Sequence, residues 1–179
     1  MNNKKNTKIY VAYGSNMDLE QMSRRCPGAV AFAKGNVKDY RLLFKGSRSG
    51  CYATIEPCEG AEVPVLLWEI DTHNEQALDR YEGFPSFYQK EIVEVETEHG
   101  LVKGMAYVMD PSRKFGAPDE WYYDVLDRAY ERFGFDQEIL EKALDDSMAE
   151  AARAGFAPGC VTSGLTSRHS APQRLGYAD

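Results

Sequence analysis

Residues 63–70 read Val-Pro-Val-Leu-Leu-Trp-Glu-Ile, a long run rich in apolar and β-branched side chains. A run of this length and composition is typical of a fully buried strand. It therefore predicts a central strand of a sheet. Pro64 has no backbone N–H to donate, so we expect it at the start of that strand.

Shorter β-prone stretches surround this run and are separated by Gly, Ser and Pro clusters. These stretches cover residues 9–13, 29–33, 40–44, 53–56, 91–95 and 102–109. Short runs bounded by turn residues indicate an antiparallel or mixed sheet. We expect residues 45–48 to form a solvated loop and residues 98–100 a hairpin turn.

Helical patterns are predicted for residues 17–25, 74–81, 119–132 and 136–154. Ser15 is expected to cap the first helix, with Asp18 completing a capping box. Asp71 and Thr72 are expected to cap the second. The chain is therefore predicted to be α+β. Residues 1–153 would form one domain and residues 154–179 an irregular C-terminal tail rich in Gly, Ser, Pro and Ala.

The composition excludes several classes of function. The 179 residues carry a net charge of −7, whereas a nucleic-acid partner would favour a basic surface. Four cysteines (Cys26, Cys51, Cys58 and Cys160) and three histidines show no metal-binding spacing, so no metal is expected. The polar N-terminus and the lack of a long apolar span predict a cytoplasmic protein without a membrane partner.

Tyr13, Gly14, Ser15 and Asn16 lie where a predicted strand turns sharply into a predicted helix. Such a turn exposes backbone N–H groups, and glycine lets a ligand approach them closely. These amides and the helix dipole favour a carboxylate or a phosphate. The plainer alternative is that Ser15 and Asn16 only cap the helix.

Glu82 lies at the end of the second predicted helix, next to Gly83 and among aromatic side chains. Apolar surroundings would raise the pKa of its carboxyl toward the range that suits proton transfer. We therefore consider Glu82 a candidate general acid and base. The alternative is a solvated carboxylate at a helix end.

Two segments together resemble signatures of the γ-glutamylcyclotransferase/AIG2-like family. The first runs from Tyr10 to Met17, and the second comprises residues 78–83 followed by Phe87 and Tyr88. The similarity spans residues 8–146 and implies a mixed or antiparallel, β-barrel-like sheet flanked by helices. It implies Glu82 as the catalytic residue. It also implies substrate binding by Tyr10, Val11, Ala12, Tyr13, Gly14, Ser15, Asn16, Tyr88 and Tyr122, with Tyr123 as an alternative to Tyr122.

The resemblance implies an enzyme that releases 5-oxoproline and a free amine from a small γ-glutamyl amide, as in glutathione metabolism, without a cofactor. The leaving amine stays open: γ-glutamylamines and a γ-glutamyl-protected biosynthetic intermediate are alternatives. Two further alternatives are a non-catalytic binding module on the same fold and a cysteine nucleophile at Cys26 or Cys51. The oligomeric state also stays open, with a homodimer as one option.

Overall fold

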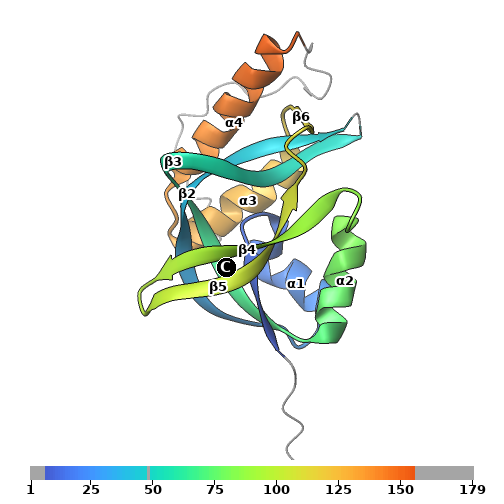
Figure 1. The fold of residues 1–179 in the computed structure, drawn as a ribbon, viewed down its shortest axis with the longest axis vertical. Helices are drawn as coiled ribbons and strands as arrows, with labels where there is room; N and C mark the ends of the chain where they lie inside the picture. The colour runs from blue at the N-terminus through green and yellow to red at the C-terminus, as the bar shows by residue number, and fades with distance from the viewer. Residues whose placement is uncertain (1–6, 48, 156–179) are drawn as a thin grey trace, which may run out of the picture.

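A computed structural model describes residues 7–47 and 49–155 of the chain. Its centre is a six-stranded mixed sheet in the order β3-β1-β5-β4-β2-β6, in which β3 also pairs with β2 (Figure 1). This extra pairing joins two distant strands of the order and closes the sheet into a barrel. The predicted α+β, barrel-like architecture is confirmed.

The strands differ greatly in length. They are β1 (Lys8–Ala12), β2 (Val30–Ser47), β3 (Gly50–Ile70), β4 (Tyr88–Thr97), β5 (Gly100–Met109) and β6 (Lys114–Phe115). Four α-helices and one 3-10 turn lie outside the barrel. They are η1 (Ser15–Met17), α1 (Leu19–Arg25), α2 (Thr72–Glu82), α3 (Glu120–Phe133) and α4 (Gln137–Arg153).

The strand predictions were correct in position but wrong in number. Residues 29–33 and 40–44 belong to the single strand β2, and residues 53–56 and 63–70 belong to β3. Gly35 and Gly60, taken as breaks, lie inside β2 and β3, and Gly35 lies at a close approach between strands. A Cβ at Gly35 would lie 2.5 Å from the backbone oxygen of Glu96 on β4.

Pro64 was wrongly predicted to start its strand. It lies in the middle of β3, opposite Asn36 of β2. On its other side β3 pairs with β1 only between Leu66 and Ile70. At Pro64 the strand therefore has one ladder partner, and an edge position of this kind tolerates a residue that cannot donate.

The first helix is capped differently from the prediction. Ser15 starts the 3-10 turn η1, and α1 begins only at Leu19. Its cap is Asp18, whose carboxylate accepts from the Gln21 N–H at 2.8 Å. The predicted cap of α2 is confirmed at Asp71, which forms a capping box with Asn74.

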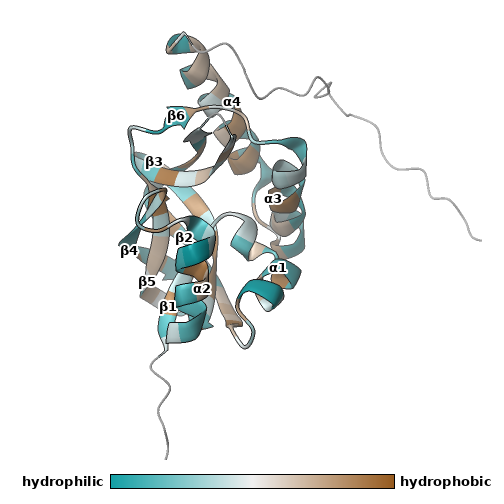
Figure 2. Ribbon diagram, turned by 90° about the vertical axis from the view of Figure 1, so that its right-hand side faces the viewer, coloured by the Kyte–Doolittle hydropathy of each residue, from teal (hydrophilic) through white to brown (hydrophobic). Residues whose placement is uncertain are grey.

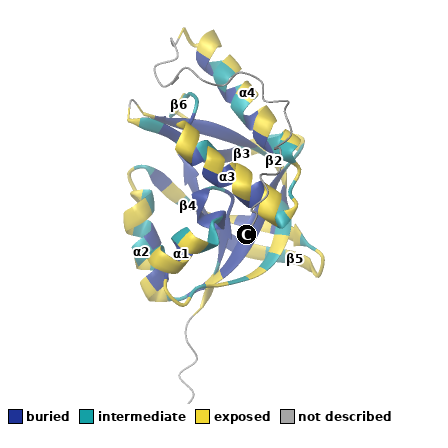
Figure 3. Ribbon diagram, turned by 180° about the vertical axis from the view of Figure 1, so that it is seen from behind, coloured by how far each residue is buried: buried dark blue, intermediate teal, exposed yellow. Residues whose placement is uncertain are grey.

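The core lies between the barrel and the inner sides of the helices, and it includes Met22 of α1 and Leu78 of α2. Figure 3 shows buried residues along the strands and exposed residues on the outer sides of these helices. Val125, Leu126 and Tyr130 of α3 are buried. In Figure 2 the outward sides of α1 and α2 are mainly hydrophilic. No helix among the described residues is long and apolar enough to cross a membrane.

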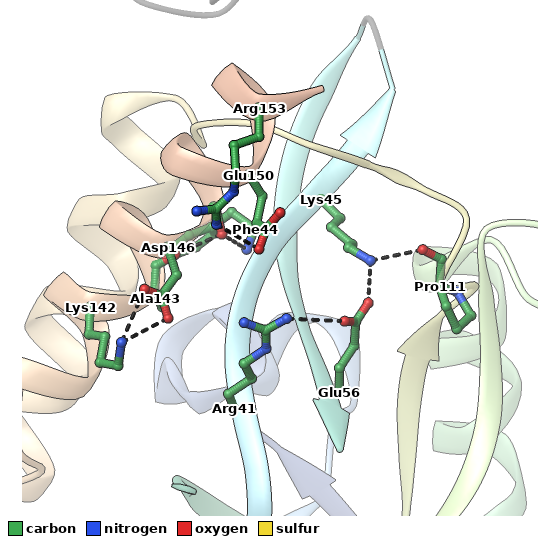
Figure 4. A network of polar contacts seen from close by, with 11 residues as sticks. Arg41, Phe44, Lys45, Glu56, Pro111, Lys142, Ala143, Asp146, Glu150 and Arg153 are labelled. Atoms are coloured by element: carbon green, nitrogen blue, oxygen red, sulfur yellow. Dashed lines mark hydrogen bonds and ion pairs between the residues drawn. The ribbon is translucent and has the colours of Figure 1, made fainter. Parts of the chain in front are cut away.

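A polar network ties the β2–β3 hairpin to its surroundings (Figure 4). Lys45, predicted in a solvated loop, has only 2% of its side chain exposed. Its ammonium pairs with Glu56 and donates to the Pro111 carbonyl at 2.9 Å. Arg41 lies 3.9 Å from the same carboxylate. The prediction for Lys45 was wrong because β2 continues through it, and Arg48 lies outside the described residues.

Candidate active site

One pocket, with a volume of about 320 Å³, opens at the end of β1, where η1, α2 and α3 meet the barrel. Most of its wall is aromatic. The lining residues are Tyr10, Tyr13, Gly14, Ser15, Asn16, Tyr52, Ala53, Tyr81, Glu82, Gly83, Phe87, Tyr88, Tyr107 and Tyr122. The pocket therefore contains both candidate motifs of the sequence, the loop at residues 13–16 and Glu82.

The loop enters the pocket at the point where β1 ends. Gly14 makes this possible, because a Cβ there would lie 3.1 Å from the Tyr122 hydroxyl. The loop then turns through η1, with the Met17 N–H donating to the Gly14 carbonyl at 3.0 Å. Trp68 fixes the turn from the core side, since its indole N–H donates to the Asn16 carbonyl at 3.1 Å.

Glu82 is the last residue of α2. Gly83 follows in the left-handed conformation, with φ of 65°, and ends the helix. The Asn16 side-chain amide donates to the Glu82 carboxylate at 2.7 Å and to the Tyr10 hydroxyl at 2.8 Å. The two motifs are therefore joined by a direct hydrogen bond.

The environment of Glu82 raises the pKa of its carboxyl from 4.5 to about 7. Burial is the main cause, and it is opposed by the Asn16 hydrogen bond and the positive charge of Arg25. A carboxyl with a pKa near 7 exists in both forms at neutral pH. It can therefore take up a proton and return it within one reaction cycle.

Two tyrosines bind the two backbone polar groups of Ala53. The Tyr88 hydroxyl donates to the Ala53 carbonyl at 2.8 Å, whereas the Tyr122 hydroxyl accepts from the Ala53 N–H at 3.2 Å. Burial raises the pKa of Tyr122, and backbone hydrogen bonds of Ala53 and Ser15 oppose the rise. Tyr122 thus accepts from the Ala53 amide, which leaves its own proton for another partner.

Tyr122, and not Tyr123, faces the pocket. Tyr122 is buried against Tyr52, with ring centroids 5.2 Å apart, while Tyr123 packs near Phe44 on the other side of α3. Val11 and Ala12, predicted to bind substrate, do not line the pocket. They are buried in β1 opposite Leu67 and Leu66, and they support the wall from behind.

Some residues at the site were not identified from the sequence. Tyr52 and Tyr107 line the pocket, beside the Tyr81 and Phe87 side chains expected around Glu82. Arg25 lies behind the loop and donates to the Asn16 side-chain oxygen at 2.7 Å. Cations are common in the last turn of a helix, so nothing in the sequence singled out Arg25. Only the alternation of strand residues could have indicated that Tyr52 and Tyr107 point inward.

The cysteine alternative has little support in this geometry. Neither Cys26 nor Cys51 lines the pocket. Burial raises the pKa of the Cys26 thiol to about 11, and its sulfur donates to the Asn74 carbonyl at 3.7 Å. Cys160 lies outside the described residues. Within residues 7–47 and 49–155, no cluster of three or more His, Cys, Asp or Glu side chains could hold a metal ion.

Comparisons with known proteins match this arrangement to one family. Residues 10–130 match the family described as "Gamma-glutamyl cyclotransferase, AIG2-like". Gamma-glutamylcyclotransferase from Mus musculus is 31% identical over 145 residues, which cover 76% of this chain and 77% of the relative. The Homo sapiens protein of the same name is 29% identical over 143 residues, with coverage of 75% and 76%. A solved structure of a gamma-glutamyl cyclotransferase aligns with a TM-score of 0.71 at 25% identity, covering 89% of this chain and 94% of the other.

Proposed function

The chain belongs to the gamma-glutamyl cyclotransferase, AIG2-like family and is an enzyme of that cyclotransferase type; on this premise, we propose that Glu82 carries the proton in the cyclisation of a small γ-glutamyl amide. The products would be 5-oxoproline and a free amine. The observation that carries this proposal is the Glu82 carboxyl, with a pKa of about 7, hydrogen bonded to Asn16 inside the pocket.

The reaction needs no water. The α-amine nitrogen of the glutamyl group attacks its own side-chain carbonyl carbon, and a C–N bond forms to close a five-membered lactam. The original amide C–N bond then breaks. Glu82 takes the proton lost by the α-amine and delivers it to the departing nitrogen, so that all atoms balance. Because the nucleophile is part of the substrate, the protein mainly has to hold the folded, reactive conformation.

Whether each tyrosine hydroxyl in the pocket wall donates or accepts supports one orientation of the substrate. The Tyr122 hydroxyl accepts from the Ala53 N–H, so it is suited to donate to the carbonyl oxygen as negative charge develops there. The Tyr88 hydroxyl donates to the Ala53 carbonyl and is suited to accept from a substrate N–H. We assign the α-carboxylate to the loop at residues 14–16, which lines the pocket next to Glu82.

Replacement of the proton carrier tests the proposal. We expect Glu82→Gln to lower kcat at least about 100-fold, because general acid and base catalysis typically contributes 10²–10⁴-fold. Glutamine keeps the size of the side chain and can still accept from Asn16, so the fold should remain. The measurement is the release of 5-oxoproline from γ-glutamyl amides.

The matched control is Glu98→Gln, at a carboxylate that is 83% exposed in the β4–β5 turn. It should retain full activity. If a folded Glu82→Gln protein turned over as fast as the wild type, Glu82 would not be the proton carrier.

Running the assay on γ-glutamyl amino acids, glutathione and γ-glutamylamines identifies the leaving amine. A cytoplasmic role in glutathione metabolism is part of the same proposal.

A further inference from the structure

Arg25 lies outside the pocket wall but contacts four side chains, three of which line the pocket. One guanidinium nitrogen donates to the Asn16 side-chain oxygen at 2.7 Å and to the Ser15 hydroxyl at 3.3 Å. The other terminal nitrogen donates to the Gln21 side chain. The guanidinium carbon Cζ lies 3.7 Å from the ring centroid of Tyr81, the residue before Glu82. Arg25 therefore links α1, η1 and the last turn of α2.

These contacts determine which way the Asn16 amide faces. A guanidinium has donors and no acceptor, so only the oxygen of the Asn16 amide can face Arg25. The amide nitrogen must then face the opposite way, toward Glu82 and Tyr10, as observed. If the amide were reversed, its oxygen would face the Glu82 carboxylate. A hydrogen bond between the Asn16 oxygen and Glu82 could then form only if Glu82 were protonated, because its carboxyl would have to donate.

We propose that Arg25 is a positioning residue that locks the Asn16 side chain as a donor to Glu82 and so keeps Glu82 in its basic form between turnovers. This inference rests on the proposed role of Glu82 as the proton carrier. It assigns to Arg25 no contact with substrate. The effect acts through Asn16, with the charge of the guanidinium adding to it.

The electrostatics around Glu82 agree with this role. A hydrogen bond donated to a carboxylate, and a nearby positive charge, both favour the charged form. Asn16 and Arg25 both lower the pKa of Glu82 against the larger effect of burial. Among the described residues, five tyrosines also interact with Glu82, and burial raises the pKa of each, so they are neutral near pH 7. They are Tyr10, Tyr13, Tyr88, Tyr107 and Tyr122.

The test is the pH dependence of kcat/KM for 5-oxoproline release, which reports the ionisation of the free enzyme. In the wild type we expect an acid limb near pH 7, where Glu82 becomes protonated. Arg25→Met removes the charge and the donors but keeps an apolar stem against Tyr81. We expect its acid limb to move up by about one pH unit, so that activity falls about tenfold at pH 6 and much less at pH 9.

Arg25→Gln is the second variant, because it loses the charge but keeps one donor for Asn16. It should move the limb in the same direction by a smaller amount. Circular dichroism and thermal unfolding identify which variants fold, and either one decides the question. A loss of activity by the same factor at every pH, with the limb unmoved, would show a merely structural role and overturn the proposal.

The matched control is Arg24→Met, since the neighbouring Arg24 side chain is 79% exposed and pairs only with Glu20 on the helix surface in the described structure. Its pH profile should equal that of the wild type.

Glu82→Gln in the same assay separates the two proposals. If Glu82→Gln is inactive and the Arg25 variants keep the wild-type limb, only the role of Arg25 is wrong. If Glu82→Gln stays active, the proposed role of Glu82 fails first.

Discussion

Glu82 combines two requirements that oppose each other. Catalysis at neutral pH needs a carboxyl that holds a proton loosely enough to exchange it, and burial at the end of α2 achieves this by disfavouring the charge. The same burial makes the charged form costly in the folded protein. The site is therefore expected to lower stability at the pH where it works.

This cost predicts a pH-dependent gain in stability for Glu82→Gln. The folded-state pKa of Glu82 is about 7, above its ordinary value of 4.5. The folded protein therefore holds this proton more tightly than the unfolded chain does, and the wild type loses stability as the pH rises from 4.5 to 7. Glutamine does not titrate, so the variant should be more stable than the wild type at pH 8 by up to about 3 kcal/mol, with a much smaller difference at pH 4.

Urea unfolding of both proteins at pH 4, 6 and 8 measures this difference. Glu98→Gln is again the matched control, because an 83% exposed carboxylate should change stability little at any of these pH values. Equal stability curves for Glu82→Gln and the wild type at pH 8 would mean that Glu82 is not destabilised by its surroundings.

At the scale of elements, the helices were easier to predict than the strands. Caps and apolar periodicity are local, so α2, α3 and α4 appear within a few residues of their predicted bounds. The lengths of β2 and β3 depend on contacts made far along the chain. Gly35 and Pro64 look like breaks in the sequence, but the first allows β4 to approach and the second lies beyond the end of β1.

One contact between elements should contribute strongly to stability. The Phe44 N–H of β2 donates to the Ser147 hydroxyl of α4 at 2.8 Å, and Ser147 in turn donates to the Ala143 carbonyl at 2.7 Å (Figure 4 shows the Phe44 and Ala143 ends). Ser147→Ala would leave a buried backbone amide without its partner. We expect a loss of about 1–3 kcal/mol in the free energy of unfolding, with kcat/KM unchanged.

The comparison variant is Ser23→Ala. Ser23 makes a similar bond to its own helix, to the Glu20 carbonyl at 2.8 Å, but it is exposed on α1. Its removal should change the free energy of unfolding by no more than about 0.5 kcal/mol. A Ser147→Ala protein as stable as the Ser23→Ala protein would show that α4 is held by its apolar contacts alone.

At the scale of the molecule, closure of the sheet creates the pocket. The loop at residues 13–16 and Glu82 could be identified from the sequence because each has a local signature. Tyr52, Tyr107 and Arg25 could not, since their nearness to the loop arises only when β3 and β5 flank β1 and α1 packs against α2. The predicted division between residues 1–153 and the tail from 154 onward stays a prediction, because residues 156–179 lie outside the described structure.

The position of the pocket within the chain yields a test of that division. Every residue that lines the pocket lies between Tyr10 and Tyr122, and α4 ends at Arg153. A chain that lacks residues 155–179 therefore keeps the lining residues and all the helices described here. We expect it to unfold at the same urea concentration as the full chain and to keep its kcat and KM across γ-glutamyl substrates. A KM that changes for some leaving amines and not for others would show that the tail reaches the pocket mouth, and a loss of stability would show that the domain extends past residue 153.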